Sequence, residues 1–257
     1  MTVSMKVASL GLALGVLLML GGCGDGAVLD RLAAGERAKV AQVTAGDTLV
    51  LQSGLAVRLS GVAAPFPEQP GADVSRADLS RLVQGKDVEL FYGGLRRDVA
   101  GQALAQVRLV AGRRWVQEAL LRDGAVRART YADNRALAQP MYAAEAYARR
   151  RRLGMWSSPV YEVRLPNEVG PDVTGFQVVE GRVARVTQTA GSVYLDFNDQ
   201  RRGFAVNIPN AALADMQSAG IAPQTLQGRL IRVRGVVDQG GLMRIDHPEP
   251  IEVLKEK

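Results

Sequence analysis

The sequence predicts an α+β protein, mainly β with short helices, built from two successive β-barrels of which the second is smaller. Three observations support this class. Short runs of alternating apolar and polar residues, typical of half-buried strands, recur along most of the chain. They fall into two groups, residues 38–158 and 175–257, and each group also contains helical stretches. Residues 159–174 are rich in Pro, Gly and Asn and are expected to be a linker.

The first unit should begin with a β-hairpin whose turn carries Asp47. A helix is expected from an N-cap at Ser75, with Asp78 completing a capping-box pattern, to Gly85. Five strands with an inserted helix fit an OB-type barrel. The expected strands are residues 39–45, 48–51, 55–61, 87–92 and 103–110, and two further helices are expected at 115–122 and 140–152.

Four motifs of this unit occur in an order that resembles the staphylococcal nuclease (thermonuclease-like) family. They are Ala45-Gly46-Asp47-Thr48 and residues 58–66, 98–105 and 115–124. Each motif alone is weak, whereas the ordered set is specific. The resemblance covers about half of the chain, and it implies an OB-type barrel that hydrolyses phosphodiester bonds with the help of calcium.

The residues that carry catalysis in that family are only partly present. The resemblance implies two aspartates that hold calcium, a glutamate that activates water and two arginines that clamp phosphate. Asp47 and Arg58 match the first aspartate and the first arginine, and the other three positions are Ala63, Phe66 and Gln102. Since calcium prefers six to eight oxygen ligands, one carboxylate should hold it weakly. The sequence therefore predicts a phosphodiesterase scaffold without most of its machinery, in which Asp47 and Arg58 are remnants.

Two alternatives concern the acidic residues of this site. Glu68 lies two residues after Phe66 in a proline-containing loop, and it or Asp73 could turn inward to replace the absent base. Acidic residues of solvated loops are more often simply exposed. Asp47 also has a simpler interpretation as a turn residue, because Gly-Asp is common in turns.

The second unit repeats the order of an OB-type barrel and looks like the OB-type tails of some bacterial nuclease-like proteins. Tyr194 or Phe197 could stack on bases, but the two positions differ in parity, so one of them should face the core. His247 is the only histidine and is expected in a turn. The expected strands are residues 177–186, 193–197, 203–208, 230–237 and 243–245, with a helix at 211–219.

The N-terminus has the pattern of an exported lipoprotein. An apolar run at residues 7–20 has the length of a signal sequence and is short for a membrane span. It leads into Leu-Gly-Gly-Cys at residues 20–23, which resembles a bacterial lipobox and implies lipid on Cys23, the only cysteine. By the same resemblance, Gly24 favours the outer membrane, and an inner-membrane anchor is the alternative. Residues 1–22 are thus a predicted signal peptide and residues 23–37 a tether, with the folded part facing the periplasm or the exterior.

The first unit is basic, which favours polyanions as partners. Residues 38–163 hold 18 Lys and Arg against 12 Asp and Glu, so the formal net charge of +6 resides there. Arginines at the end of the last helix could simply stabilise its C-terminus as solvated cations. They could also bind the phosphates of nucleic acid or of anionic lipid. These residues are Arg149, Arg150, Arg151 and Arg152.

Together these features favour a lipid-anchored envelope protein whose nuclease-like unit binds nucleic acid or another phosphate-bearing polyanion, or serves as a scaffold. No cofactor is then expected, and catalysis is not its role. One alternative is an active calcium-dependent nuclease that uses Asp47, Arg58 and Glu68. Another is an envelope module that binds a protein partner.

Overall fold

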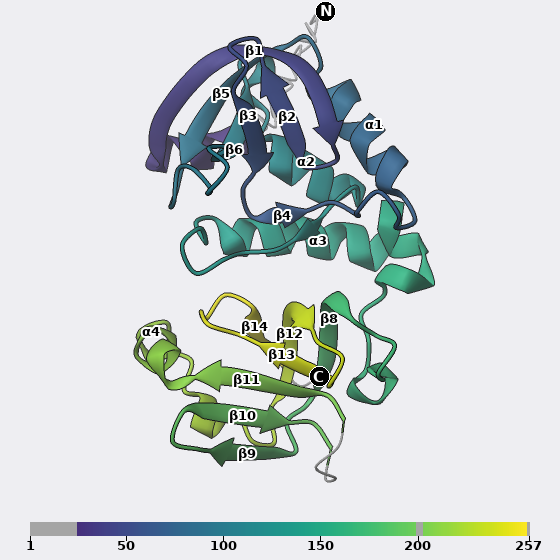
Figure 1. Cartoon of the computed structure of the whole chain (residues 1–257), viewed down its shortest axis with the longest axis vertical. Coiled ribbons are helices and arrows are strands. Elements are labelled where there is room, and N and C mark those ends of the chain that lie inside the picture. The colour runs from purple at the N-terminus through teal and green to yellow at the C-terminus, as the bar shows by residue number, and fades with distance from the viewer. Residues whose placement is uncertain (1–24, 199–202, 256–257) are drawn as a thin grey trace, which may run out of the picture.

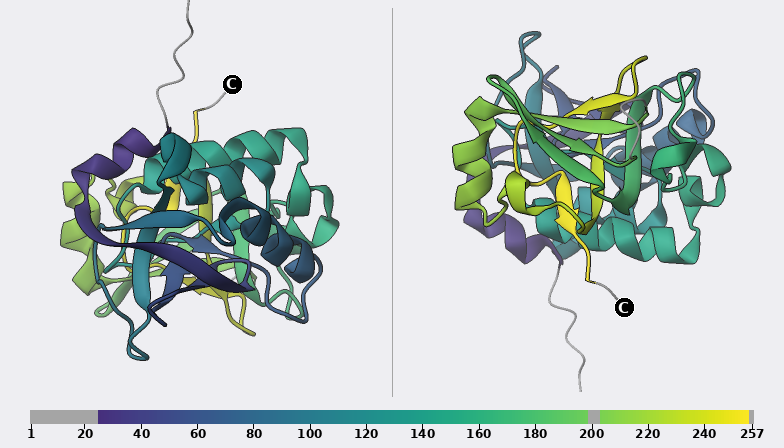
Figure 2. Two further views of the ribbon diagram at one scale, coloured as in Figure 1. Left: turned by 90° about the horizontal axis from the view of Figure 1, so that it is seen from above. Right: turned by 90° about the horizontal axis from the view of Figure 1, so that it is seen from below.

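The computed structural model describes residues 25–198 and 203–255, which form a barrel, a second sheet and the helices between them (Figure 1). The predicted signal peptide, residues 1–22, and the predicted lipidation site, Cys23, lie outside the described residues. Within the described part of the chain, no helix combines the length and the apolar content needed to cross a membrane. Views along the long axis show the barrel stacked on the second sheet (Figure 2).

The predicted first barrel is confirmed as a closed five-stranded barrel in the order β1-β2-β3-β6-β5. The long strand β1 closes it, because residues 33–39 pair with β5 and residues 40–45 pair with β2. β3 and β6 are parallel, and the other neighbours are antiparallel. The strands are β1 (Ala33–Ala45), β2 (Thr48–Leu51), β3 (Ala56–Leu59), β5 (Asp87–Tyr92) and β6 (Ala103–Leu109).

The described part of the predicted tether packs against the barrel. The 3-10 helix η1 (Asp25–Arg31) precedes β1, and Leu29 is fully buried in the barrel core. Arg108 donates from Nη1 to Asp30 Oδ1 at 2.6 Å and to the carbonyl oxygen of Gly26 at 3.2 Å. The few apolar residues of this segment stand among small and charged ones without a periodic pattern, which is why the sequence suggested a tether.

Three helices accompany the barrel: α1 (Ala72–Val83), α2 (Val116–Asp123) and α3 (Ala138–Arg151). The prediction of Ser75 as N-cap is wrong, since α1 begins one turn earlier, after Gly71, and Ser75 is buried within it. Gly71 adopts φ 85°, a left-handed conformation that glycine accepts without strain, and this lets the helix start directly after the proline loop. Gly124, also left-handed, ends α2 as predicted.

A small two-stranded sheet lies beside the barrel and was not expected from the sequence. It pairs β4 (Val62–Ala63) with β7 (Arg127–Ala128) in antiparallel register, so that Ala63 stands opposite Arg127. This pairing joins the loop after β3 to the segment between α2 and α3. It therefore brings residues far apart in the sequence to the same side of the barrel.

The second unit is a seven-stranded sheet that is not closed, so the prediction of a second closed barrel is corrected. The single strand expected at 177–186 is interrupted at Val183 and Ala184; its first part pairs with β12 and its second part with β10. Phe197 packs in the core against Phe204, and Tyr194 is half-buried, so one of the two aromatics faces the core as expected. The elements are β8 (Gly175–Arg182), β9 (Arg185–Gln188), β10 (Ser192–Asp196), β11 (Ala205–Pro209), α4 (Leu213–Ser218), β12 (Leu230–Val237), β13 (Leu242–Arg244) and β14 (Ile251–Val253).

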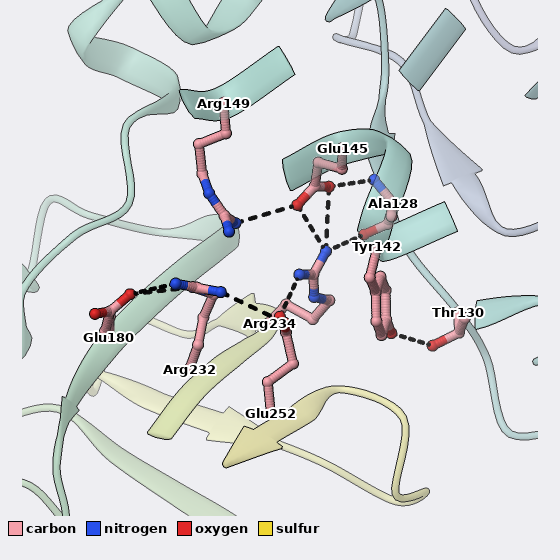
Figure 3. Close-up of polar contacts among 9 residues, drawn as sticks. All are labelled: Ala128, Thr130, Tyr142, Glu145, Arg149, Glu180, Arg232, Arg234 and Glu252. Atoms are coloured by element: carbon pink, nitrogen blue, oxygen red, sulfur yellow. Dashed lines mark hydrogen bonds and ion pairs between the residues drawn. The ribbon is translucent and has the colours of Figure 1, made fainter. Parts of the chain in front are cut away.

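A buried ionic network ties α3 to the second sheet (Figure 3). Arg234 of β12 donates from Nη1 to Glu145 Oε1 of α3 at 3.0 Å and from Nη2 to Glu252 Oε1 of β14 at 2.6 Å. The arginine is 2% exposed and Glu145 is 0% exposed. The predicted linker also packs here, since the Tyr161 hydroxyl donates to the carbonyl oxygen of Pro70 at 2.6 Å. The two units are therefore in direct contact.

Candidate functional site

The positions that the nuclease resemblance singled out meet in one pocket of about 260 Å³. Asp47, Arg58, Ala63, Phe66 and Gln102 all line it. The hairpin register explains part of this convergence, because β2 and β3 pair with Thr48 opposite Arg58. The short β4 then carries Ala63 along the same side. These five positions thus lie together, although further residues that the sequence analysis did not single out also line the pocket.

Asp47 is 8% exposed, and both of its carboxylate oxygens are engaged within the fold. Oδ1 accepts a hydrogen bond from Thr48 Oγ1 at 3.0 Å, and Oδ2 accepts one from the backbone N–H of Ala64 at 3.3 Å. The backbone carbonyl of Asp47 also accepts from the N–H of Leu59 at 2.8 Å. Asp47 therefore fastens the loop after β4 to the first hairpin.

The two acidic residues considered as a relocated base do not reach this pocket. Glu68 is exposed and does not line it. Asp73 is exposed in the first turn of α1, where its Oδ1 accepts from Arg76 Nη2 at 3.0 Å. Phe66, which stands where the family has its glutamate, is 61% exposed at the rim. The structure therefore brings no carboxylate other than Asp47 to the lining of this pocket.

The residues of the pocket do not fit a calcium ion. Calcium gains affinity from several carboxylate and carbonyl oxygens, whereas the only carboxylate here already accepts two hydrogen bonds. Three guanidinium groups, those of Arg58, Arg127 and Arg129, line the same space and would repel a cation. Within residues 25–198 and 203–255, no three His, Cys, Asp or Glu side chains are grouped so as to hold a metal ion.

Arg127 is the functional residue that the sequence reasoning missed. It lies on β7, is 7% exposed and lines the pocket. Its Nη1 donates to the carbonyl oxygen of Phe176 at 3.0 Å, and its guanidinium lies over the rings of Tyr161 at 4.9 Å and Phe176 at 4.8 Å. It forms no ion pair with any described residue. Burial lowers the pKa of Arg127 to about 10, although Glu145 attracts its charge from a distance.

Two further arginines stand beside Arg127. Arg58 and Arg129 are half-buried, and neither side chain has a hydrogen bond or ion pair within the described residues. The guanidinium of Arg129 lies over the rings of Tyr131 at 4.9 Å and Phe176 at 5.4 Å. The alternation of Arg127 and Arg129 after α2 is the signal that could have revealed them, because alternate residues of an extended segment share a face. The pocket consequently has an excess of positive charge.

An apolar pocket of about 270 Å³ adjoins this basic one and shares Arg58 with it. Its lining includes Leu95, Val99, Leu104 and Tyr131. Val99 and Tyr131 are exposed, so the apolar surface is open to solvent. A charged group held by Arg58 could therefore carry an apolar or aromatic group into the neighbouring space.

The four predicted polyanion-binding arginines do not act as one cluster. Arg149 turns into the buried ionic network, its Nη1 lies 3.5 Å from Glu145 Oε1 of the same helix, and burial lowers the pKa of its guanidinium (Figure 3). Arg150 and Arg151 are exposed, and Arg151 lies over the ring of Tyr147 at 4.5 Å. Arg152 is exposed and pairs with Glu162 at 3.4 Å. A four-residue run covers every side of a helix end, so the helix necessarily turns one of these side chains inward.

Comparison with known proteins agrees with the geometry of the barrel. The family model described as staphylococcal nuclease homologue matches residues 56–158, which extend from β3 past α3. No curated protein matches the chain at a significant level. The hairpin with Asp47 lies just before the matched residues, and the second sheet lies after them. Residues 56–158 therefore form a domain of the staphylococcal nuclease homologue family, a family of phosphodiesterases.

Proposed function

We propose that the nuclease-like unit binds nucleic acid through its phosphates and is not an efficient nuclease. One observation carries this proposal: Arg127 is a buried cation that faces a pocket and has no counter-ion within the described residues. Burying an unpaired charge costs several kcal/mol, and proteins ordinarily compensate such a charge with a partner. A bound anion would supply that partner.

A phosphate group suits the pocket better than a carboxylate or a small halide. Arg58, Arg127 and Arg129 converge on it from β3 and from the segment after α2. Several guanidinium groups together can donate a large set of charge-assisted hydrogen bonds, which suits the charged non-bridging oxygens of a phosphate group. The adjoining apolar pocket favours a nucleotide over inorganic phosphate, because a base could enter it while Arg58 holds the phosphate.

Weak catalysis is the second part of the proposal. Phe66 cannot accept a proton from water, and neutral Gln102 cannot stabilise charge that develops on phosphorus as an arginine would. The loss of one such donor typically lowers a rate about 10²- to 10³-fold. The exposed positions of Glu68 and Asp73 support the proposal, since neither lines the pocket.

We also propose that the protein is exported and anchored to a membrane through lipid on Cys23. The apolar run at residues 7–20 and the lipobox-like sequence ending in Cys23 support export and attachment to a membrane through lipid. The nucleic acid or other phosphate-bearing polymer would then be met outside the cytoplasm. Incorporation of labelled fatty acid into the wild-type chain but not into a Cys23→Ala variant would test this part.

Binding is tested with the full chain purified in a mild detergent and a fluorescent octathymidylate. We expect anisotropy to report binding that weakens steeply with salt, and Arg127→Met to weaken it at least about tenfold. Arg229→Gln is the matched control, because Arg229 is exposed on the second unit and lines none of the pockets described above. Equal binding by wild type and Arg127→Met would contradict the proposal.

Catalysis is tested on the same preparations with calcium present. We expect the wild type to cleave the oligonucleotide poorly and a triple variant, Ala63→Asp, Phe66→Glu and Gln102→Arg, to cleave it faster, because the pocket would regain the charges that the family uses. Rapid cleavage by the wild type that Glu68→Gln abolishes would instead support the active nuclease. Absence of any salt-dependent binding would favour the module that binds a protein partner.

A further inference from the structure

A second pocket, of about 180 Å³, lies where the barrel unit meets the second sheet. It shares Arg129 and Phe176 with the basic pocket of the barrel, so the two are neighbours. The second sheet contributes Arg244 at the end of β13 and His247 from the loop before β14. The pocket is therefore built by both units, and residues 56–158 alone do not contain it.

The charges of this second pocket are unequally compensated. His247 is 4% exposed, and its ring nitrogens contact Asp246 Oδ1 at 2.7 Å and Thr130 Oγ1 at 2.9 Å, so it joins the two units and is more than a turn residue. Asp246 contacts His247 through Oδ1 alone, and its side chain is 58% exposed. Arg244 is exposed and has no side-chain hydrogen bond or ion pair within the described residues. Arg129, contributed by the barrel unit, is likewise unpaired there, so two guanidinium groups without partners line the pocket against one carboxylate.

Phe176 connects the two pockets physically. It belongs to β8 of the second sheet, and its ring lies beneath the guanidinium groups of both Arg127 and Arg129, at 4.8 Å and 5.4 Å. Its carbonyl oxygen accepts the hydrogen bond from Arg127. Phe176 is thus a positioning residue: the second sheet holds in place the arginines that line the pocket of the barrel.

From this geometry we propose that the two pockets form one track for a single-stranded oligonucleotide, with one phosphate at Arg58 and Arg127 and a following phosphate at Arg129 and Arg244. This inference rests on the proposed phosphate-binding function and specifies its ligand. Tyr131 lines both the second pocket and the apolar pocket and is 41% exposed, so it offers a surface on which an unpaired base can stack. A flexible single strand can place successive phosphates and bases into adjacent small pockets, which a stiff duplex cannot do.

The test compares three probes on the full chain in detergent: thymidine monophosphate, octathymidylate and a DNA hairpin duplex. We expect octathymidylate to bind at least about tenfold more tightly than the mononucleotide and the duplex. Arg244→Gln should weaken octathymidylate binding about tenfold and leave the mononucleotide unaffected. In Arg244→Gln, the plot of log affinity for octathymidylate against log salt concentration should be less steep by about 0.7, which is the contribution of one phosphate contact on a single strand. Arg229→Gln should change none of these values.

The outcomes separate this inference from the function on which it rests. If the mononucleotide binds through Arg127 but Arg244→Gln alters neither the affinity nor the salt slope for octathymidylate, the track is wrong and the phosphate pocket stands. Tighter binding of the duplex than of the single strand would also overturn the track. If no probe binds, or if Arg127→Met binds as the wild type does, the proposed function itself fails. Phe176→Ala adds a check, because it should weaken mononucleotide and octathymidylate binding together.

Discussion

Two buried arginines, Arg127 in the barrel pocket and Arg234 in the contact between the units, show how differently the same side chain can be used. Their exposures are 7% and 2%. Burial acts against the charge of both. Around Arg234 the carboxylates of Glu145 and Glu252 outweigh burial and raise the pKa of its guanidinium above the ordinary value. Around Arg127 burial prevails and lowers the pKa to about 10.

The difference lies in the partners that the fold supplies. Arg234 receives one carboxylate from α3 and one from β14, and its guanidinium also lies over the ring of Tyr142 at 3.9 Å (Figure 3). Arg127 receives only a carbonyl oxygen and two aromatic rings. A buried arginine paired with two carboxylates holds elements together, whereas one without a counter-ion and facing a pocket is poised for an anionic ligand.

The largest effect should come from removing a partner of Arg234. Glu145→Gln leaves the buried guanidinium of Arg234 with Glu252 as its one remaining carboxylate and should destabilise the protein by about 3 kcal/mol. For a chain of this size that corresponds to a fall in Tm of roughly 6–12 °C. Thermal unfolding followed by circular dichroism would measure it.

Controls distinguish this buried pair from surface charge. Glu162→Gln removes the exposed partner of Arg152 and should shift Tm by less than about 1 °C. The double variant Glu145→Leu and Arg234→Met should be more stable than Glu145→Gln, because it removes the buried guanidinium together with its partner, while Glu252 keeps its ion pair with Arg232. If Glu145→Gln shifted Tm as little as Glu162→Gln does, the ion pair of Arg234 and Glu145 would not stabilise the protein, and the proposed difference between Arg234 and Arg127 would be wrong.

Arg127→Met, in contrast to Glu145→Gln, should weaken oligonucleotide binding and leave the stability of the protein unchanged or increased. The charged form of Arg127 is disfavoured by burial, so the unfolded chain binds the proton more readily than the folded one. That penalty is fully present below pH 10 and is relieved as the pH rises from about 10 toward 12.5. Urea denaturation at pH 7 should therefore show wild type no more stable than Arg127→Met.

The alkaline range provides the internal check on this prediction. Wild type should gain stability relative to Arg127→Met as the pH rises above about 10. Only the wild type has the buried guanidinium of Arg127, and the cost of burying its charge disappears as it loses its proton. A strongly destabilised Arg127→Met at pH 7 would show that the contacts with Tyr161 and Phe176 outweigh the cost of burial. Arg127 would then be a structural residue like Arg234.

The sequence predicted the barrel because strand alternation is a local pattern, and the resemblance to the nuclease family supplied five of the positions that line the pocket. Strand alternation and a Gly-Asp turn defined the first hairpin, and the ordered motifs placed Arg58 and Gln102 in one site. The sequence left two roles open for Asp47, that of a remnant metal ligand and that of a turn residue. Its two hydrogen bonds within the fold give it a structural role at the turn.

The remaining features depend on long-range contacts that leave no periodic signal. Arg127 and Arg129 follow α2 in a segment with only two strand residues, and their role becomes visible only when β7 pairs with β4. The burial of Leu29 and of His247 likewise depends on partners distant in the sequence. The interruption of the strand at Val183 and Ala184 occurs within an alternation that continues through it.

The smallest effect is expected for Asp47→Asn, and it separates the two interpretations of the barrel pocket. The asparagine oxygen can accept from the N–H of Ala64, but the Thr48 hydroxyl must then accept from the asparagine amide instead of donating to a charged oxygen, so about 1 kcal/mol of stability should be lost. Because a negative charge leaves a pocket lined by three arginines, octathymidylate affinity should stay the same or rise a few-fold, with calcium making no difference. If calcium instead tightened binding by the wild type and Asp47→Asn removed that response, Asp47 would be a metal ligand and the pocket that of a nuclease. Measuring affinity with calcium and then with a chelator decides between these results, since repulsion from three guanidinium groups and attraction to one carboxylate predict opposite responses to the ion.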